Sequence, residues 1–205
     1  MTLNYVRYAL SPLVCAVMFS AAPLFAGQPS TPVTAVVLPD GRYSKVAVRE
    51  MAREAAHILK QSGVSLRWHL GIPAQSVSGM LVVVKLVGHC DVDASPAYFV
   101  PGPLGWAHEV DGAMLPFTDL ACDNLRGAVE SARSGGSGPA GNVLLGRAMG
   151  RVLAHELYHI VADTSVHARD GVAQSAFTPR QLTSGPLELG ASEVTAVQNG
   201  LVRAR

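Results

Sequence analysis

The sequence predicts an α/β (α+β) fold, in which a mixed, twisted sheet with an antiparallel edge strand packs on one long helix. Three observations predict it. Short apolar runs typical of buried strands are separated by a segment of helical periodicity, which indicates a parallel crossover and an α/β layer. A second helical pattern, longer and uninterrupted, follows the last strand. The less periodic stretch after it predicts a small C-terminal subdomain.

Residues 1–26 are expected to be a secretory signal peptide, not part of the fold. Arg7 is their only charge, residues 8–25 form an apolar stretch, and the small Ala26 stands where cleavage would occur. The apolar stretch is interrupted and has no cationic flank, so we expect no stable membrane span in the mature chain. The sequence therefore predicts a secreted or periplasmic protein with a single domain, residues 27–205.

The charge and the cysteine content of the chain narrow the possible class of protein further. The 205 residues hold 16 Lys and Arg against 15 Asp and Glu, so the chain has no basic excess of the kind that nucleic-acid binding requires. Cys90 and Cys122 are the cysteines outside the signal. In an exported chain such a pair is expected to form a disulfide, and two separately buried cysteines are the alternative.

The first half of the domain is predicted to run strand, helix, strand, strand. Residues 34–38 are a short apolar run closed by a turn, and residues 44–61 are an amphipathic helix that Gly63 ends. Residues 64–69 alternate in polarity, whereas residues 80–87 are almost continuously apolar, so the second of these strands is expected to be more deeply buried.

The second half is predicted to add an edge strand, a last strand and helices. Residues 104–110 alternate small and larger side chains, as an edge strand would. The remaining elements are expected at residues 115–122 (strand), 123–132 (short helix), 134–141 (glycine-rich flexible loop) and 143–163 (long helix capped by Asn142). Gly146 and Gly150 are expected to let the long helix approach the sheet closely.

An H-E-x-x-H motif, His155-Glu156-Leu157-Tyr158-His159, lies within this long helix. Residues four apart in a helix lie one turn above each other, so both imidazoles can reach one metal ion. Glu156 points about a hundred degrees around the helix, where it can contact an activated water without occupying a coordination position. Tyr158 faces away from the metal side and is expected to pack.

Catalytic zinc needs a third protein ligand, and His167 is the main candidate. It can reach the site only if the helix ends near residues 163–165 and the chain turns back. Asp163, Glu188 and Glu193 are the alternatives as third ligand. The remaining histidines, His57, His69, His89 and His108, have no ligand spacing and are expected to be structural or exposed.

The motif and His167 resemble the metzincin class of zinc peptidases, in which H-E-x-x-H is followed by a turn glycine, a third histidine and a methionine turn. The sequence also looks like small exported bacterial proteins with an H-E-x-x-H-x7-H pattern. It departs from the metzincin pattern in three ways. Ala162 replaces the turn glycine, His167 is displaced by two residues, and residues 171–177 contain no methionine.

The resemblance implies a secreted metallopeptidase with one catalytic Zn²⁺ bound by His155, His159 and His167, and with Glu156 as general base. It also implies that a peptide or protein substrate pairs with the edge strand at residues 104–110. Two alternatives remain, a non-catalytic zinc-binding protein and a zinc amidase or other hydrolase of non-protein substrates. The sequence does not indicate an oligomeric state.

Overall fold

The computed structural model describes residues 31–204, except for residue 78 and the ranges 95–101 and 133–138. The expected signal peptide and most of the expected glycine-rich loop therefore lie outside the described residues. Among the described residues, no helix combines the length and the apolar character needed to cross a membrane.

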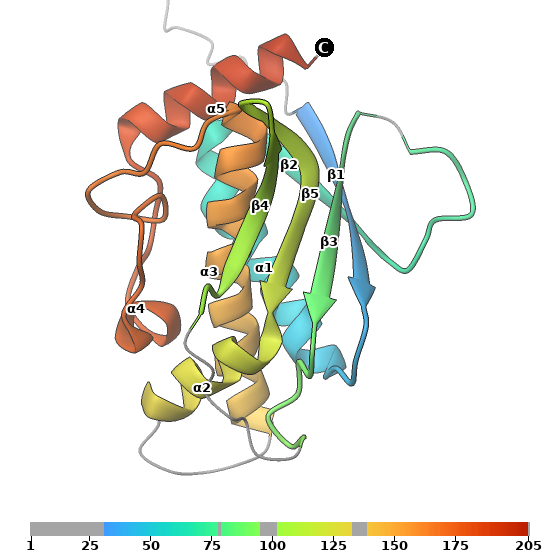
Figure 1. The fold of residues 1–205 in the computed structure, drawn as a ribbon, viewed down its shortest axis with the longest axis vertical. Helices are drawn as coiled ribbons and strands as arrows, with labels where there is room; N and C mark the ends of the chain where they lie inside the picture. The colour runs from blue at the N-terminus through green and yellow to red at the C-terminus, as the bar shows by residue number, and fades with distance from the viewer. Residues whose placement is uncertain (1–30, 78, 95–101, 133–138, 205) are drawn as a thin grey trace, which may run out of the picture.

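One five-stranded sheet forms the first layer of the fold (Figure 1). Its strands are β1 (Thr31–Pro39), β2 (Val64–Leu70), β3 (Met80–Val87), β4 (Gly105–Val110) and β5 (Ala113–Ala121). Their order in the sheet is β2-β1-β3-β5-β4, and every neighbouring pair is parallel except β4 with β5. This confirms the predicted mixed sheet and its antiparallel edge strand.

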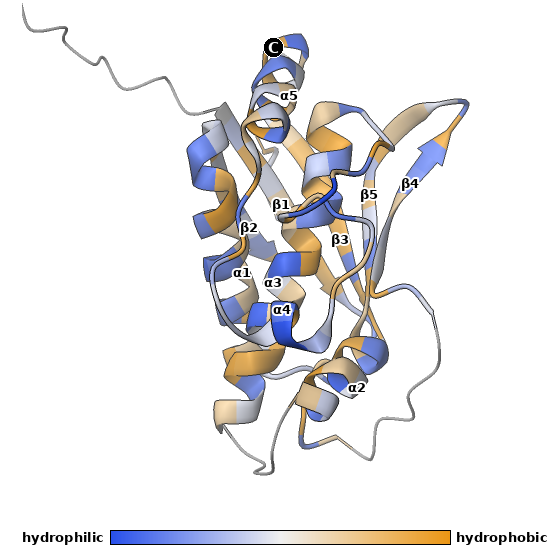
Figure 2. Ribbon diagram, turned by 90° about the vertical axis from the view of Figure 1, so that its left-hand side faces the viewer, coloured by the Kyte–Doolittle hydropathy of each residue, from blue (hydrophilic) through white to orange (hydrophobic). Residues whose placement is uncertain are grey.

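The helices form the second layer. They are α1 (Lys45–Leu59), α2 (Cys122–Ala132), α3 (Pro139–Ala162), α4 (Pro179–Thr183) and α5 (Ala191–Arg203), with a short 3-10 turn at Lys60–Ser62. Figure 2 shows α1 and α3 together on one side of the sheet, with the hydrophilic turns of α1 facing outward. The long helix thus packs on the sheet as predicted, and the chain after it forms the smaller C-terminal part.

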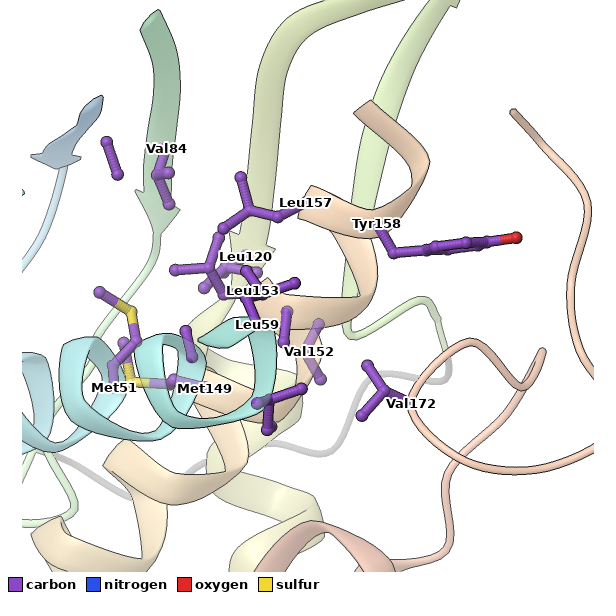
Figure 3. Close-up of a cluster of buried hydrophobic side chains, with 14 of the residues drawn as sticks. Met51, Leu59, Val84, Leu120, Met149, Val152, Leu153, Leu157, Tyr158 and Val172 are labelled. Carbon is purple, nitrogen blue, oxygen red and sulfur yellow. The ribbon is translucent and has the colours of Figure 1, made fainter. Parts of the chain in front are cut away.

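The core lies between these two layers. Alternate residues of the central strands, such as Val84 and Leu120, are fully buried against Met51 of α1 and Met149 of α3 (Figure 3). Burying a side chain of this size contributes roughly 1.5–3 kcal/mol relative to leaving it exposed. The same packing fixes α3 against the sheet, and α3 carries the H-E-x-x-H motif.

Gly146 and Gly150 contact α1, not the sheet, so the sequence-based expectation for these two residues was wrong. A Cβ atom at Gly150 would lie 2.6 Å from the Cβ of Glu54 and 2.8 Å from the backbone oxygen of Met51. Gly146 approaches the backbone of Ala47 in the same way. The two glycines bring α1 and α3 into direct backbone contact.

Replacing Gly150 with alanine is therefore expected to destabilise the protein by about 1–3 kcal/mol, the usual cost of overpacking a core. On a helix without this neighbour the same change would stabilise by about 1 kcal/mol, because alanine is the better helix former. The free energy of unfolding in urea measures the difference. An alanine variant as stable as the wild type would show that α1 and α3 do not need this close approach.

Both ends of α3 differ slightly from the predicted residues 143–163. The helix begins at Pro139 and ends at Ala162, and Asn142 lies inside it. The Asn142 side chain does not cap the helix, because it accepts a hydrogen bond from the Val92 backbone at 3.2 Å and donates one to Asp91 at 3.3 Å. Asn142 therefore ties the helix to the loop after β3.

The predicted disulfide is present. Cys90, in the loop after β3, is bonded to Cys122, the first residue of α2, and both residues are fully buried. The disulfide attaches α2 to the carboxyl end of β3. It is compatible with an extracytoplasmic location, where disulfides persist.

Candidate metal centre

Three imidazoles meet beside the second half of α3. His155 and His159 project from one face of the helix, one turn apart, and His167 approaches from the segment that follows it. One ligand atom from each of the three lies within 4.8 Å of the other two. The structure thus brings together all three histidines that the sequence analysis selected.

The turn after α3 explains how His167 reaches this position. Asp163 adopts a left-handed conformation (φ 53°), which ends the helix. Its carboxylate accepts a hydrogen bond at 3.0 Å from the backbone of Met114, at the start of β5. The Thr164 N–H donates to the carbonyl of His159 at 3.1 Å and completes the turn. Helix termination, which the sequence reading required, is confirmed.

The carboxylates considered as alternative third ligands do not join the cluster. Among the described residues, the three histidines form the only group of three or more His, Cys, Asp or Glu residues placed to bind a metal ion. The Asp163 carboxylate accepts a hydrogen bond from the Met114 backbone, and the Glu193 carboxylate accepts one from Ser192. Glu188 is exposed outside the cluster.

Hydrogen bonds to the backbone fix the tautomers of two imidazoles. His155 Nδ1 lies 2.8 Å from the carbonyl oxygen of Val172, and His159 Nδ1 lies 2.7 Å from that of Thr164. A carbonyl only accepts, so both Nδ1 atoms carry the proton and both Nε2 atoms of the neutral rings carry a lone pair.

These two lone-pair nitrogens lie 3.0 Å apart. Two acceptors at this distance repel each other unless a cation lies between them. Zinc in tetrahedral coordination at about 2.0–2.1 Å from each nitrogen would hold them about 3.3 Å apart. The donor set therefore fits a zinc ion with very small adjustments.

Burial keeps these two imidazoles neutral. Removal from water lowers the pKa of His155 to about 4, although its hydrogen bond to Val172 opposes part of the shift. Burial also lowers the pKa of His159 below its ordinary value. A metal binds the neutral imidazole, so both rings are in the binding form at neutral pH without having to lose a proton.

Glu156 is also buried, on a neighbouring face of α3. Burial raises the pKa of its carboxyl group to about 7, and a hydrogen bond from the backbone of Ala107 in β4 acts in the opposite direction. A carboxyl group with a pKa near the working pH both accepts and returns a proton efficiently. The edge strand thus contacts the residue predicted to act as base.

A cavity of about 580 Å³ opens beside the site. Its walls come from α2, α3, the chain entering β4, and residues 175–179. Among the described residues that line it, His155 and Glu156 are the ionisable ones. Apart from these two residues, the cavity offers an uncharged, largely apolar surface next to the histidine cluster.

Several groups at the site were not foreseen. The backbone carbonyls of Val172 and Thr164 could not be recognised in the sequence, because every residue has a backbone carbonyl. Phe177 contacts His155 edge-to-face, with ring centroids 5.6 Å apart. The segment without a methionine thus places an aromatic ring against one of the three clustered histidines.

Tyr158 points away from the core cluster of α3 (Figure 3), and it has a second contact besides packing. Its hydroxyl donates a hydrogen bond at 3.1 Å to the carbonyl of Val166, the residue before His167. Its ring also lies beside His159, with centroids 5.1 Å apart. Tyr158 therefore links α3 to the backbone that presents the third histidine.

Replacing Tyr158 with phenylalanine should lower stability by about 0.5–1.5 kcal/mol, because the Val166 carbonyl loses its donor while the ring is kept. Binding of Zn²⁺ should weaken as well, since His167 is held less firmly. Urea unfolding and chelator competition measure the two effects. Undiminished zinc affinity would show that the Tyr158 hydroxyl does not help to position His167.

Fold and site together define a two-layer α/β protein with a three-histidine cluster on its long helix. Among solved structures, its fold is similar to that of the crystal structure of archaemetzincin from Methanopyrus kandleri, with a TM-score of 0.51. The match covers 87% of this chain and 99% of that chain, at 15% sequence identity. This similarity confirms the predicted metzincin-like fold. No protein-family model matches the sequence, and comparison with curated proteins finds no significant match.

Proposed function

We propose that the protein is a zinc-dependent metallopeptidase whose single Zn²⁺ is bound by His155, His159 and His167. The observation that carries the proposal is the pair of buried, tautomer-fixed Nε2 atoms 3.0 Å apart, with a third imidazole beside them. Three protein ligands that leave a fourth position open are characteristic of catalytic zinc. The similarity of the fold to archaemetzincin supports the same class.

The bound ion would supply a Lewis acid that polarises a peptide carbonyl and makes a water molecule more acidic. In this proposal the Glu156 carboxylate accepts the proton of the attacking water and then donates it to the nitrogen of the leaving amine. The Ala107 N–H orients one oxygen of that carboxylate. The carbonyls of Val172 and Thr164 hold the two helix-borne imidazoles in their ligating tautomers.

An extended peptide would bind along β4. Among the described strands, β4 pairs only with β5, so its other edge can accept another strand. Main-chain hydrogen bonds from this edge would align the peptide bond beside Glu156, which Ala107 of the same strand contacts. In the same proposal, residues 27–205 form a single exported catalytic domain released from the signal at residues 1–26.

Digestion of a mixture of unlabelled peptides by the mature chain, followed by mass spectrometry, tests the activity. We expect cleavage products that disappear when zinc is removed by chelation and return when Zn²⁺ is added back. Products that survive chelation would come from a contaminant or from metal-independent chemistry. Cleavage confined to non-peptide amides would instead favour the amidase alternative.

A further inference from the structure

Arg151 lies on α3 one turn before His155, and it is buried, with 3% of its surface exposed. Its Nε donates a hydrogen bond at 2.9 Å to Glu54 of α1, which is also buried. An unpaired charge at this depth would be strongly unfavourable. The pair therefore forms a fixed polar contact between the two central helices.

The rest of the guanidinium group binds the chain around the end of α4. Its Nη1 donates to the carbonyls of Gln181 and Ser184, the latter at 2.9 Å, and its Nη2 donates to the carbonyl of Gly185 at 2.6 Å. The planar guanidinium presents its donors in a fixed fork. One side chain of α3 thus fixes the position of three backbone carbonyls.

These carbonyls belong to residues 163–190, here called the site segment, which supplies the third histidine of the cluster and the backbone carbonyls that bind the other two. It carries His167, and its Phe177 ring contacts His155. A short path of backbone bonds leads from Arg151 to the site. Three residues beyond Gly185, the Glu188 carbonyl accepts from the Val172 N–H at 2.9 Å, and the Val172 carbonyl accepts from His155.

Stability alone does not explain the buried pair. The loss of hydration largely offsets the attraction between two buried charges, and apolar residues of similar volume often stabilise a fold as well or better. A guanidinium that binds three carbonyls in fixed directions does hold the backbone in a defined position. The hydrogen-bonded path from that group to His155 links this position to the orientation of the imidazole.

We propose that Arg151, supported by Glu54, is a positioning residue of the metal centre. It fixes the site segment so that the Val172 carbonyl orients His155 for metal binding and Phe177 stays against the same ring. The inference rests on the proposed function for the identity of the metal. The position of the segment against His155 is a property of the metal-free protein as well.

The test compares the double variant Glu54→Gln/Arg151→Met with Glu54→Gln alone. The shared Glu54→Gln change avoids a buried unpaired carboxylate in the double variant, and in Glu54→Gln alone the guanidinium keeps its bonds to the three carbonyls. The two proteins therefore differ only at Arg151, in its charge and in its bonds to the carbonyls. We expect the double variant to bind Zn²⁺ about 10- to 100-fold more weakly in chelator competition, as is usual when a group supporting a ligand is lost. In the metal-free protein, the NMR signal of the His155 Nδ1 proton, protected in Glu54→Gln, should be lost by exchange with water.

Arg147→Met is the matched control, because Arg147 lies one turn earlier on α3 and, within the described residues, donates to a single carbonyl of the site segment, that of Thr183, at 3.0 Å. It should retain both the zinc affinity and the His155 proton signal. If the double variant does not fold, Arg151→Lys replaces it, since lysine keeps a cation opposite Glu54 but lacks the planar fork. The proposal is overturned if the folded Arg151 variant retains its zinc affinity and the His155 signal. A wild type that binds no zinc would refute the proposed function, while the His155 signal would still decide the role of Arg151.

Discussion

Replacing His167 with alanine is expected to remove tight zinc binding while the fold remains. His167 is the exposed member of the cluster and comes from a loop, so its loss leaves the core packing intact. Only the two helix-borne imidazoles would then remain as protein ligands. Loss of a hydrogen-bond partner of a ligand already weakens metal binding about 10- to 100-fold, so loss of the ligand itself should exceed about 100-fold.

Elemental analysis of the purified chain and chelator competition measure this effect. The wild type should contain one zinc per chain. His89→Ala is a suitable control, because His89 is partly exposed and does not belong to the cluster. If His167→Ala retained one zinc with wild-type affinity, the three-histidine site would be wrong.

The second large effect is expected for Glu156→Gln. Peptide cleavage should fall by about 10²- to 10⁴-fold, the usual contribution of a general base, because an amide cannot accept the proton of the attacking water. Zinc should remain bound, since Glu156 is not part of the ligand cluster. The amide oxygen can still accept the hydrogen bond from Ala107, so the side chain should keep its place.

Rates of peptide cleavage and the zinc content of the same preparations should be measured together. Glu130→Gln is a control of the same chemistry on α2, away from the cluster. Activity that survives Glu156→Gln would remove Glu156 from the mechanism. A wild type that binds zinc but cleaves no peptide would favour the non-catalytic alternative.

The sequence predicted the groups of the site that depend on local spacing. His155 and His159 follow from the helical repeat, and His167 follows from the need for a third ligand beyond a helix end. The sheet order β2-β1-β3-β5-β4 could not be derived in the same way, because strand pairing joins residues distant in the sequence. The role of Ala107 depends on that pairing and was missed for the same reason.

Other features were missed because their sequence signals suit more than one partner. Small residues four apart on a helix indicate a close approach, but Gly146 and Gly150 do not show whether a sheet or a helix approaches. Asn142 is a good helix cap, yet its amide also suits the loop after β3, which it binds here. Nothing in the sequence distinguishes Arg151 from Arg147, one turn earlier on the same helix. Only the packed structure shows that Arg151 is buried and which carbonyls it contacts.

The distribution of the site along the chain has a consequence for the order in which it can assemble. The imidazoles all lie between His155 and His167, so one helix end and one turn are enough to bring them together. Ala107, which contacts Glu156, lies far earlier in the chain and reaches it only when the sheet has formed. Contacts between near neighbours form faster than long-range pairings. During folding the ligand cluster can therefore close before the carboxyl group acquires its final surroundings.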